Sequence, residues 1–242
     1  MFYKILAAIF IWVSLNIGAF AAERAAFDLI GYSPDGKYFA FEEYGIQDGS
    51  GFAYSTIFII DVAEDKWVAG APYRYQAEDE EIDLYSARTS AQSMAEPALL
   101  SLNITHPAQA LAIKADGDPA NPDLELPFNL PGHTGVDAMW GEYELQLSVF
   151  DVPSTENCAS YMEEATQGFA LYLAADGNIN LIHQDDNIPK SRGCPLAYRL
   201  SAIVVPFQDT NLSRAIALVS VWAFGFEGPD RRFIAVPLNY EE

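Results

Sequence analysis

The sequence predicts a mainly β protein built from antiparallel meanders, with a single helix near residues 80–94. Three observations predict this class. Short segments rich in aromatic and β-branched residues recur along most of the chain, turn residues such as Pro-Asp-Gly and Asp-Gly separate them, and one central stretch lacks strand-like alternation. Because short turns join neighbouring segments, we expect most strands to pair antiparallel.

The first 21 residues have the composition of a secretory signal peptide. Lys4 precedes an uncharged run from Ile5 to Phe20, and Ala19-Phe20-Ala21 supplies the small residues of an A-x-A cleavage site. We therefore expect residues 22–242 to form one β-rich domain that is secreted or periplasmic and makes no stable membrane insertion after cleavage. The alternative is an uncleaved anchor, since the apolar run approaches the length that spans a bilayer.

The charge of the chain limits its partners. It contains 34 acidic residues against 13 Lys and Arg, a formal net charge of −21. Such a surface repels phosphate backbones, so we expect no nucleic-acid binding. An envelope protein or a small ligand remains as the possible partner.

Cys158 and Cys194 are the two cysteines of the chain. In an oxidising compartment an even pair most simply forms a disulfide. Two separate buried thiols and a redox pair remain as alternatives, although a redox pair is more often spaced C-x-x-C.

Residues 27–62 predict three strands joined by two hairpins. The first turn is Pro34-Asp35-Gly36, in which proline presets φ, Asp35 can accept bonds from nearby amides and Gly36 can adopt a positive φ. The second, looser turn is Asp-Gly-Ser-Gly at residues 48–51.

The same stretch carries a family resemblance. SPDGKYFAFEEYG followed by STIFIIDV resembles a blade of the TolB-type or WD40-like β-propellers. A propeller requires several copies at a fixed period, and here one clear copy is accompanied by a looser echo at Phe169–Gln184, with Asp176-Gly177 as its turn. The fold class is therefore propeller-like or sandwich-like meanders, with closure left open.

The helix is expected from about Glu80 to Met94, ending before Pro97. Apolar residues between Ala77 and Ile104 recur at near-helical spacing, and acids in a first turn complement the helix dipole. We therefore interpret the acidic run at residues 78–83 as a helix start and not as a ligand cluster.

Further strands are expected in the rest of the chain. Their segments are short runs of alternating or continuous apolar residues bounded by Gly, Pro, Asn or Asp. They lie at residues 110–115, 124–128, 142–152, 195–207, 213–228 and 231–238.

Two longer segments carry a second resemblance. IPKSRGCPLAYRL (Ile188–Leu200) and GFEGPDRRFIAVP (Gly225–Pro237), together with SPDGKYFAFEEYG and the exported start, resemble an uncharacterised family of predicted secreted bacterial proteins that carries a domain-of-unknown-function label. The resemblance covers nearly all of the mature chain. It implies export and a shared fold, and it brings no catalytic residues.

Basic residues are scarce, and six of them fall between Lys190 and Arg232. One interpretation is structural, with Glu227 or Asp230 pairing with an arginine across the turn at Gly228-Pro229. The functional hypothesis is a site for an anionic group of a ligand. Its candidate residues are Arg192, Arg199, Arg231 and Arg232.

One acidic loop is a candidate calcium site. Its oxygen-bearing residues are Asp116, Asp118, Asn121 and Asp123. The spacing departs from an EF-hand, because Ala120 takes the fifth position and two prolines intervene. The three histidines lack zinc-ligand spacing, and neither a Rossmann glycine motif nor a P-loop occurs, so no cofactor is expected.

These observations favour a non-enzymatic binding or scaffold protein that acts on an envelope partner. The alternative is a carboxylate-based hydrolase of envelope glycan, because paired acids and aromatic platforms are what glycosidases use. The residues considered for it are Glu42, Glu43, Glu142 and Glu144, with Trp67, Trp140 and Trp222.

Overall fold

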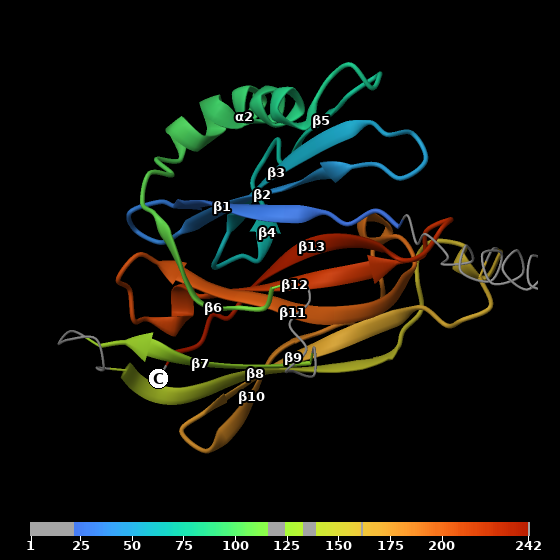
Figure 1. The fold of residues 1–242 in the computed structure, drawn as a ribbon. Helices are drawn as coiled ribbons and strands as arrows, with labels where there is room; N and C mark the ends of the chain where they lie inside the picture. The colour runs from blue at the N-terminus through green and yellow to red at the C-terminus, as the bar shows by residue number, and fades with distance from the viewer. Residues whose placement is uncertain (1–21, 116–123, 133–138, 161, 242) are drawn as a thin grey trace, which may run out of the picture.

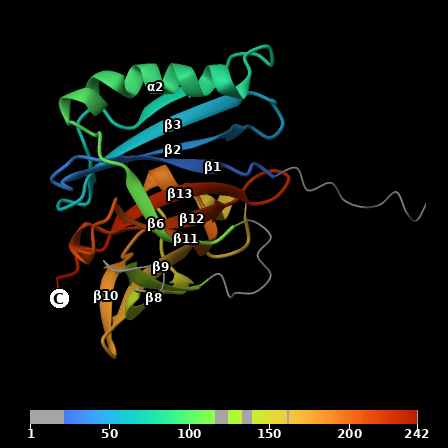
Figure 2. The same cartoon turned by 60° about the vertical axis from the view of Figure 1, so that its left-hand side comes forward.

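The computed structural model describes residues 22–115, 124–132, 139–160 and 162–241, which form four stacked layers (Figures 1 and 2). Helix α2 (Leu84–Ser101) is the first layer and covers the N-terminal sheet. The N-terminal sheet packs on a middle sheet, and the middle sheet packs on an outer sheet. The predicted signal peptide, residues 1–21, lies outside the described residues.

Each sheet is an antiparallel meander, with one strand of the middle sheet coming from far away in sequence. The N-terminal sheet has the order β1 (Ala26–Tyr32), β2 (Tyr38–Ile46), β3 (Ala53–Asp61), β4 (Lys66–Trp67), and β5 (Tyr73–Gln76) also pairs with β3. The middle sheet has the order β13 (Asp230–Pro237), β12 (Ile216–Ala223), β11 (Pro195–Pro206), β6 (Ala108–Ile113). The outer sheet has the order β10 (Asn178–Gln184), β9 (Gln167–Ala175), β8 (Met139–Asp151), β7 (Glu125–Pro131).

The middle sheet is buried on both faces. In β11, Ala202 and Val204 pack against the N-terminal sheet, whereas Ile203 and Val205 pack against the outer sheet, and all four are fully buried. Covering on both sides explains why this strand is continuously apolar, since a strand with one solvated face alternates.

The sandwich-like expectation is confirmed, and the propeller-like one is not supported. The sheets of the described residues stack face to face, and none of them closes around an axis (Figure 1). The segment that resembles a propeller blade forms the meander β1-β2-β3. Such a meander occurs both in the stacked sheets of a sandwich and in the radial blades of a propeller. The C-terminal strands all appear where the sequence places them, with ends shifted by a few residues.

The first turn has the predicted chemistry. Asp35 Oδ1 accepts hydrogen bonds from the Ser33 hydroxyl at 2.6 Å and the Lys37 N–H at 3.1 Å, and Gly36 has a φ of 70°. The second hairpin predicted from an Asp-Gly pair is also present, joining β9 to β10 at Asp176 and Gly177.

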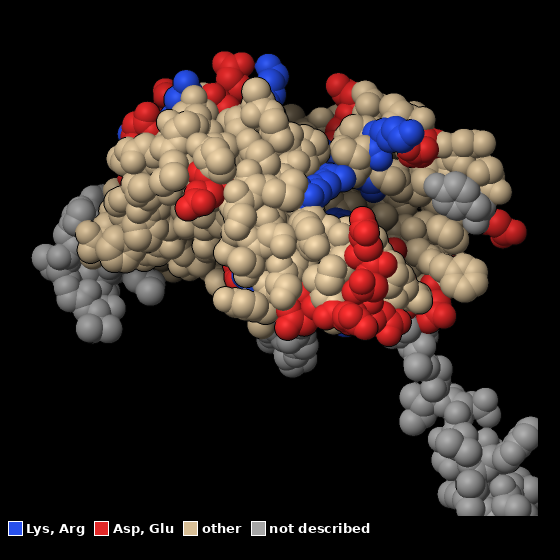
Figure 3. Space-filling view, turned by 90° about the horizontal axis from the view of Figure 1, so that it is seen from above, with Lys and Arg blue, Asp and Glu red and all other residues tan. Residues whose placement is uncertain are grey.

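The helix was placed too early. It begins after Asp83, whose side chain caps the Ser86 N–H at 2.8 Å, and it continues through Pro97 to Ser101. The helix continues because Ala98 and Leu99, beyond the proline, still pack on the N-terminal sheet. The acidic residues 78–81 lie in the exposed loop before the helix, and acidic side chains are prominent on the face viewed from the α2 side (Figure 3).

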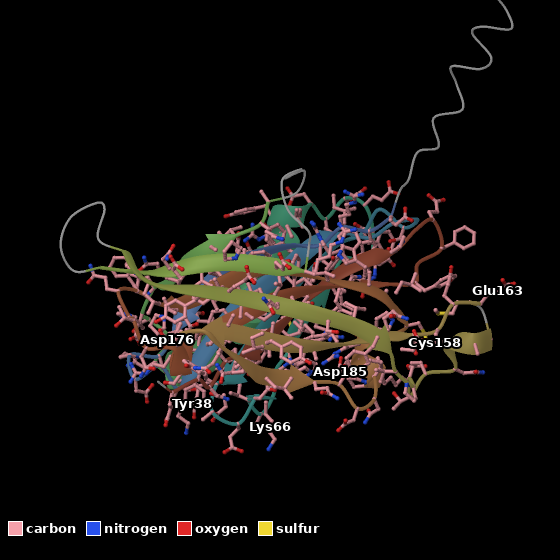
Figure 4. The ribbon with its side chains drawn as sticks, turned by 90° about the horizontal axis from the view of Figure 1, so that it is seen from below. Tyr38, Lys66, Cys158, Glu163, Asp176 and Asp185 are labelled. Carbon is pink, nitrogen blue, oxygen red and sulfur yellow. A yellow bond between two sulfur atoms is a disulfide. The ribbon has the colours of Figure 1, made fainter. Side chains whose placement is uncertain are left out.

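The predicted disulfide between Cys158 and Cys194 is confirmed. Their Cα atoms are 5.7 Å apart, and the bond links the loop after β8 to the residue before β11. It therefore ties the outer sheet to the middle sheet at one end of the molecule, where Cys158 is labelled in Figure 4. Among the described residues, no helix has both the length and the hydrophobicity needed to span a membrane.

Candidate functional site

A cleft of about 600 Å³ lies along β13, the edge strand of the middle sheet. The N-terminal sheet forms its roof, and β10 with the short helix η2 (Lys190–Arg192) contributes its floor. Its apolar lining includes Phe58 and Ile60 of the roof and Ile234 and Val236 of β13. Charged side chains line it as well, among them Glu43, Arg192 and Arg232.

A buried ion cluster forms part of the lining of the cleft through Glu43, Tyr54 and Arg232. Arg232 lies 2.6 Å from Glu23 and 3.6 Å from Glu43, and its Nη1 donates to the Tyr54 hydroxyl at 3.1 Å. Both glutamates are buried. Because Arg232 joins Glu23 of the N-terminal segment to Glu43 of β2, the cluster fastens β13 to the N-terminal sheet.

Glu43 also binds the edge of β13 directly. Its Oε2 accepts the N–H of Phe233 at 2.6 Å. Burial raises the pKa of Glu43 to about 7, although the charges of Arg232 and Arg74 and the bond from Phe233 oppose this increase. The carboxyl group therefore titrates near neutral pH.

A second charged group borders the cleft where His183 and Arg192 line it. Asp185 accepts from Arg192 Nη1 at 2.7 Å, from the Phe169 N–H at 3.0 Å, and contacts His183 Nε2 at 3.0 Å. Burial opposes its ionisation, but the bond to His183 and the charge of Arg192 lower the pKa of Asp185 overall. Arg192 is thus held in place before any ligand arrives.

The four predicted ligand arginines fall into two separate pairs. Arg192 and Arg232 both line the cleft. Arg199 and Arg231 lie over the ring of Trp222 instead, with guanidinium-to-centroid distances of 4.7 and 5.6 Å. The structure therefore brings together two members of the predicted set in the cleft and places the other two beside Trp222.

Of the residues considered for a hydrolase, Glu43 and Trp67 line the cleft, whereas Glu42, Glu142, Glu144 and Trp222 do not. Glu142 and Glu144 belong to β8 of the outer sheet. Glu42 is 1% exposed and pairs with Arg88 at 2.8 Å, which gives it a structural role on the α2 side of the N-terminal sheet. Of the candidate platform tryptophans, Trp67 lines the cleft.

The candidate calcium ligands Asp116, Asp118, Asn121 and Asp123 lie outside the described residues, as does the side chain of Trp140. Within the part of the chain that the structure describes, no group of three or more His, Cys, Asp or Glu side chains could hold a metal ion.

The ion cluster of Glu23, Glu43 and Arg232 was not predicted from the sequence. Glu23 and Arg232 lie at opposite ends of the chain, so no local motif connects them. One signal was present: Glu43 follows Phe39 and Phe41 at two-residue spacing, and both phenylalanines are buried in the interface with the middle sheet. A charge on the apolar face of a strand requires a buried partner.

Comparison with known proteins identifies a family. The family model described as DUF2259, predicted secreted protein, matches residues 40–239, which include all the residues that line the cleft, from Phe41 to Val236. Comparison with curated proteins gives no match. Because the matched segment spans most of the sequence, the chain belongs to the DUF2259 family of predicted secreted proteins.

Proposed function

We propose that this chain is a non-enzymatic periplasmic binding protein whose cleft along β13 receives an envelope protein or a small ligand. The observation that carries this proposal is the cleft itself, which combines apolar residues with charged side chains in its lining. Its volume of about 600 Å³ falls in the range of ligand-binding sites.

The two arginines that line the cleft support binding because their side chains are already ordered. Arg232 is fixed by Glu23 and Glu43, and Arg192 is fixed by Asp185. A ligand that contacts them would lose little free energy in ordering these side chains. The same pairing reduces the charge that either arginine offers to an anion, so the apolar residues that line the cleft become the main source of affinity.

One observation favours the alternative, a carboxylate-based hydrolase of envelope glycan. Glu43 lies in the cleft with a pKa raised to about 7, as a general acid requires, and Trp67 lies in the same cleft. However, one Glu43 oxygen accepts the Phe233 N–H and the other faces Arg232, which leaves the carboxyl engaged in structure. Glycan turnover lost in Glu43→Gln and retained in Glu144→Gln would support the hydrolase.

Site-specific photo-cross-linking in the host envelope tests the binding proposal. A benzophenone amino acid replaces Trp67, which lines the cleft and is 46% exposed, or in a control replaces Tyr85 of α2, which is 78% exposed. We expect a discrete adduct from position 67 that is absent from position 85. Equal labelling from both positions, or none from position 67, would contradict binding in the cleft.

A further inference from the structure

The outward edge of β13 has a regular set of backbone groups. The Arg231 N–H donates to the Glu23 carbonyl at 2.8 Å, and the Phe233 N–H donates to the Glu43 carboxylate at 2.6 Å. Both groups point away from β12. Because these groups alternate in direction from one residue to the next, every second residue points the same way. The N–H and C=O of Ala235 therefore also point outward, and Ala235 lines the cleft.

The N-terminal segment already uses the first part of this edge. Residues 23–25 run parallel to β13, with Arg24 opposite Arg231 and the Ala25 N–H donating to the Arg231 carbonyl at 3.4 Å. The chain then leaves β13 to become β1 of the N-terminal sheet. The pairing therefore stops after Arg231, and the following part of the edge borders the cleft.

The walls of the cleft suit a second strand at this position. Phe58 and Ile60 lie in the roof, and Ile234 and Val236 lie in the wall formed by β13. A strand presents alternate side chains to opposite sides, so one laid along β13 would direct one set toward the roof and the other toward the floor. Backbone pairing supplies affinity in such complexes, and the pockets for alternate side chains supply selectivity.

We propose that the cleft binds an extended polypeptide segment, which adds as a strand to β13 and hydrogen bonds to the backbone of Ala235. This inference rests on the proposed function, because it names the class of ligand for the same cleft. Residues 232–236 of β13 line the cleft, and at about 3.3 Å per residue they span about 13 Å. The bound segment is therefore about four to six residues long, with apolar side chains at alternate positions.

Amide hydrogen exchange of the disulfide-bonded protein, followed by NMR, tests strand addition directly. The probe is a pool of acetylated, amidated hexapeptides that alternate Lys or Thr with Val, Leu or Phe, and the control is the same pool with every amide nitrogen methylated. In the free protein we expect the Ala235 amide to exchange at least tenfold faster than the amides of Ile234 and Val236, which face β12. The unmethylated pool should slow exchange at Ala235 at least tenfold, and the methylated pool should leave it unchanged.

A pair of variants provides an independent test. Ala235→Pro removes the outward N–H, which the ladder to β12 does not use, whereas Ala235→Gly retains it. We expect peptide binding to weaken at least tenfold in Ala235→Pro relative to Ala235→Gly. If Ala235→Pro does not fold, the exchange experiment on the unchanged chain still decides.

The outcomes separate this inference from the proposed function. An Ala235 amide that is as protected in the free protein as its neighbours, or that the peptide pool does not protect, overturns strand addition. If position 67 still captures an occupant in the envelope, the binding function stands without it. If position 67 captures nothing and Ala235 gains no protection, both are wrong.

Discussion

Replacing Glu43 with Gln should leave the free energy of unfolding little changed at acidic pH and should raise it, relative to the unchanged protein, above neutral pH. Glu43 is 3% exposed, and its Oε2 accepts the Phe233 N–H at 2.6 Å. Glutamine is nearly the same size and retains an acceptor for that bond. The substitution therefore removes one titrating group from the cleft and changes little of its packing.

The expected magnitude follows from the raised pKa of Glu43, which is about 7 against an ordinary value of 4.5. The folded protein holds a proton that the unfolded chain releases between these values. The stability that this proton contributes is present below pH 4.5 and is lost as the pH rises through 7. The difference of about 2.5 pKa units, at about 1.4 kcal/mol each, gives a loss of about 3 kcal/mol that Glu43→Gln avoids.

Urea unfolding across the pH range from about 4 to about 8 measures this effect. We expect the free energy of unfolding of Glu43→Gln to rise by about 3 kcal/mol relative to the unchanged protein over that range. Glu163→Gln is the matched control, since it removes an exposed carboxylate at the disulfide end of the molecule (Figure 4). Parallel curves for Glu43→Gln and the unchanged protein would refute the argument that burial controls this carboxyl.

Three further sets of substitutions test the rest of the structure by denaturant unfolding. Replacing both cysteines with alanine should cost about 4 kcal/mol, because the disulfide joins residues 36 apart in sequence; free thiols in the exported protein would contradict the bond itself. Arg88→Met should lower the free energy of unfolding by about 3 to 5 kcal/mol, because it leaves buried Glu42 without its cation. Adding Glu42→Gln should recover more than half of this loss, and no recovery would contradict the role of the ion pair. Gly31→Ala should cost about 2 to 4 kcal/mol, because its Cβ would lie 2.5 Å from the His106 carbonyl oxygen, whereas Gly177→Ala meets open space and should cost less; equal costs would exclude the clash as the cause.

The parts of the fold that depend on neighbours in sequence could be predicted. The turn at Asp35 and Gly36 and the hairpin at Gly177 follow from residue types that favour those backbone angles. The disulfide followed from cysteine number and the exported start. The end of α2 could not be predicted from Pro97, because Ala98 and Leu99 pack on a sheet formed by distant residues.

The arrangement of the sheets and the cleft depends on contacts that no local pattern contains. A three-stranded meander has the same sequence pattern whether its sheet stacks or forms a blade, so the SPDGK turn could not distinguish the two. Arg192 and Arg232 were both candidates on the ground that basic residues are scarce. Their shared place in one cleft results from the packing of the N-terminal sheet and η2 beside β13.

The double burial of the middle sheet imposes an order on folding. Three of its four strands, β11 to β13, come from the last fifth of the sequence. A chain that emerges N-terminus first has already produced both neighbouring sheets, and each has an apolar face with nothing to cover it until this last segment arrives. Glu23 likewise cannot form its ion pair until Arg232, which lies near the opposite terminus, has been synthesised. Folding is therefore expected to finish only after the C-terminal strands have been translocated. Loss of these strands would leave two sheets with exposed apolar faces, which are prone to aggregate, instead of a smaller stable protein.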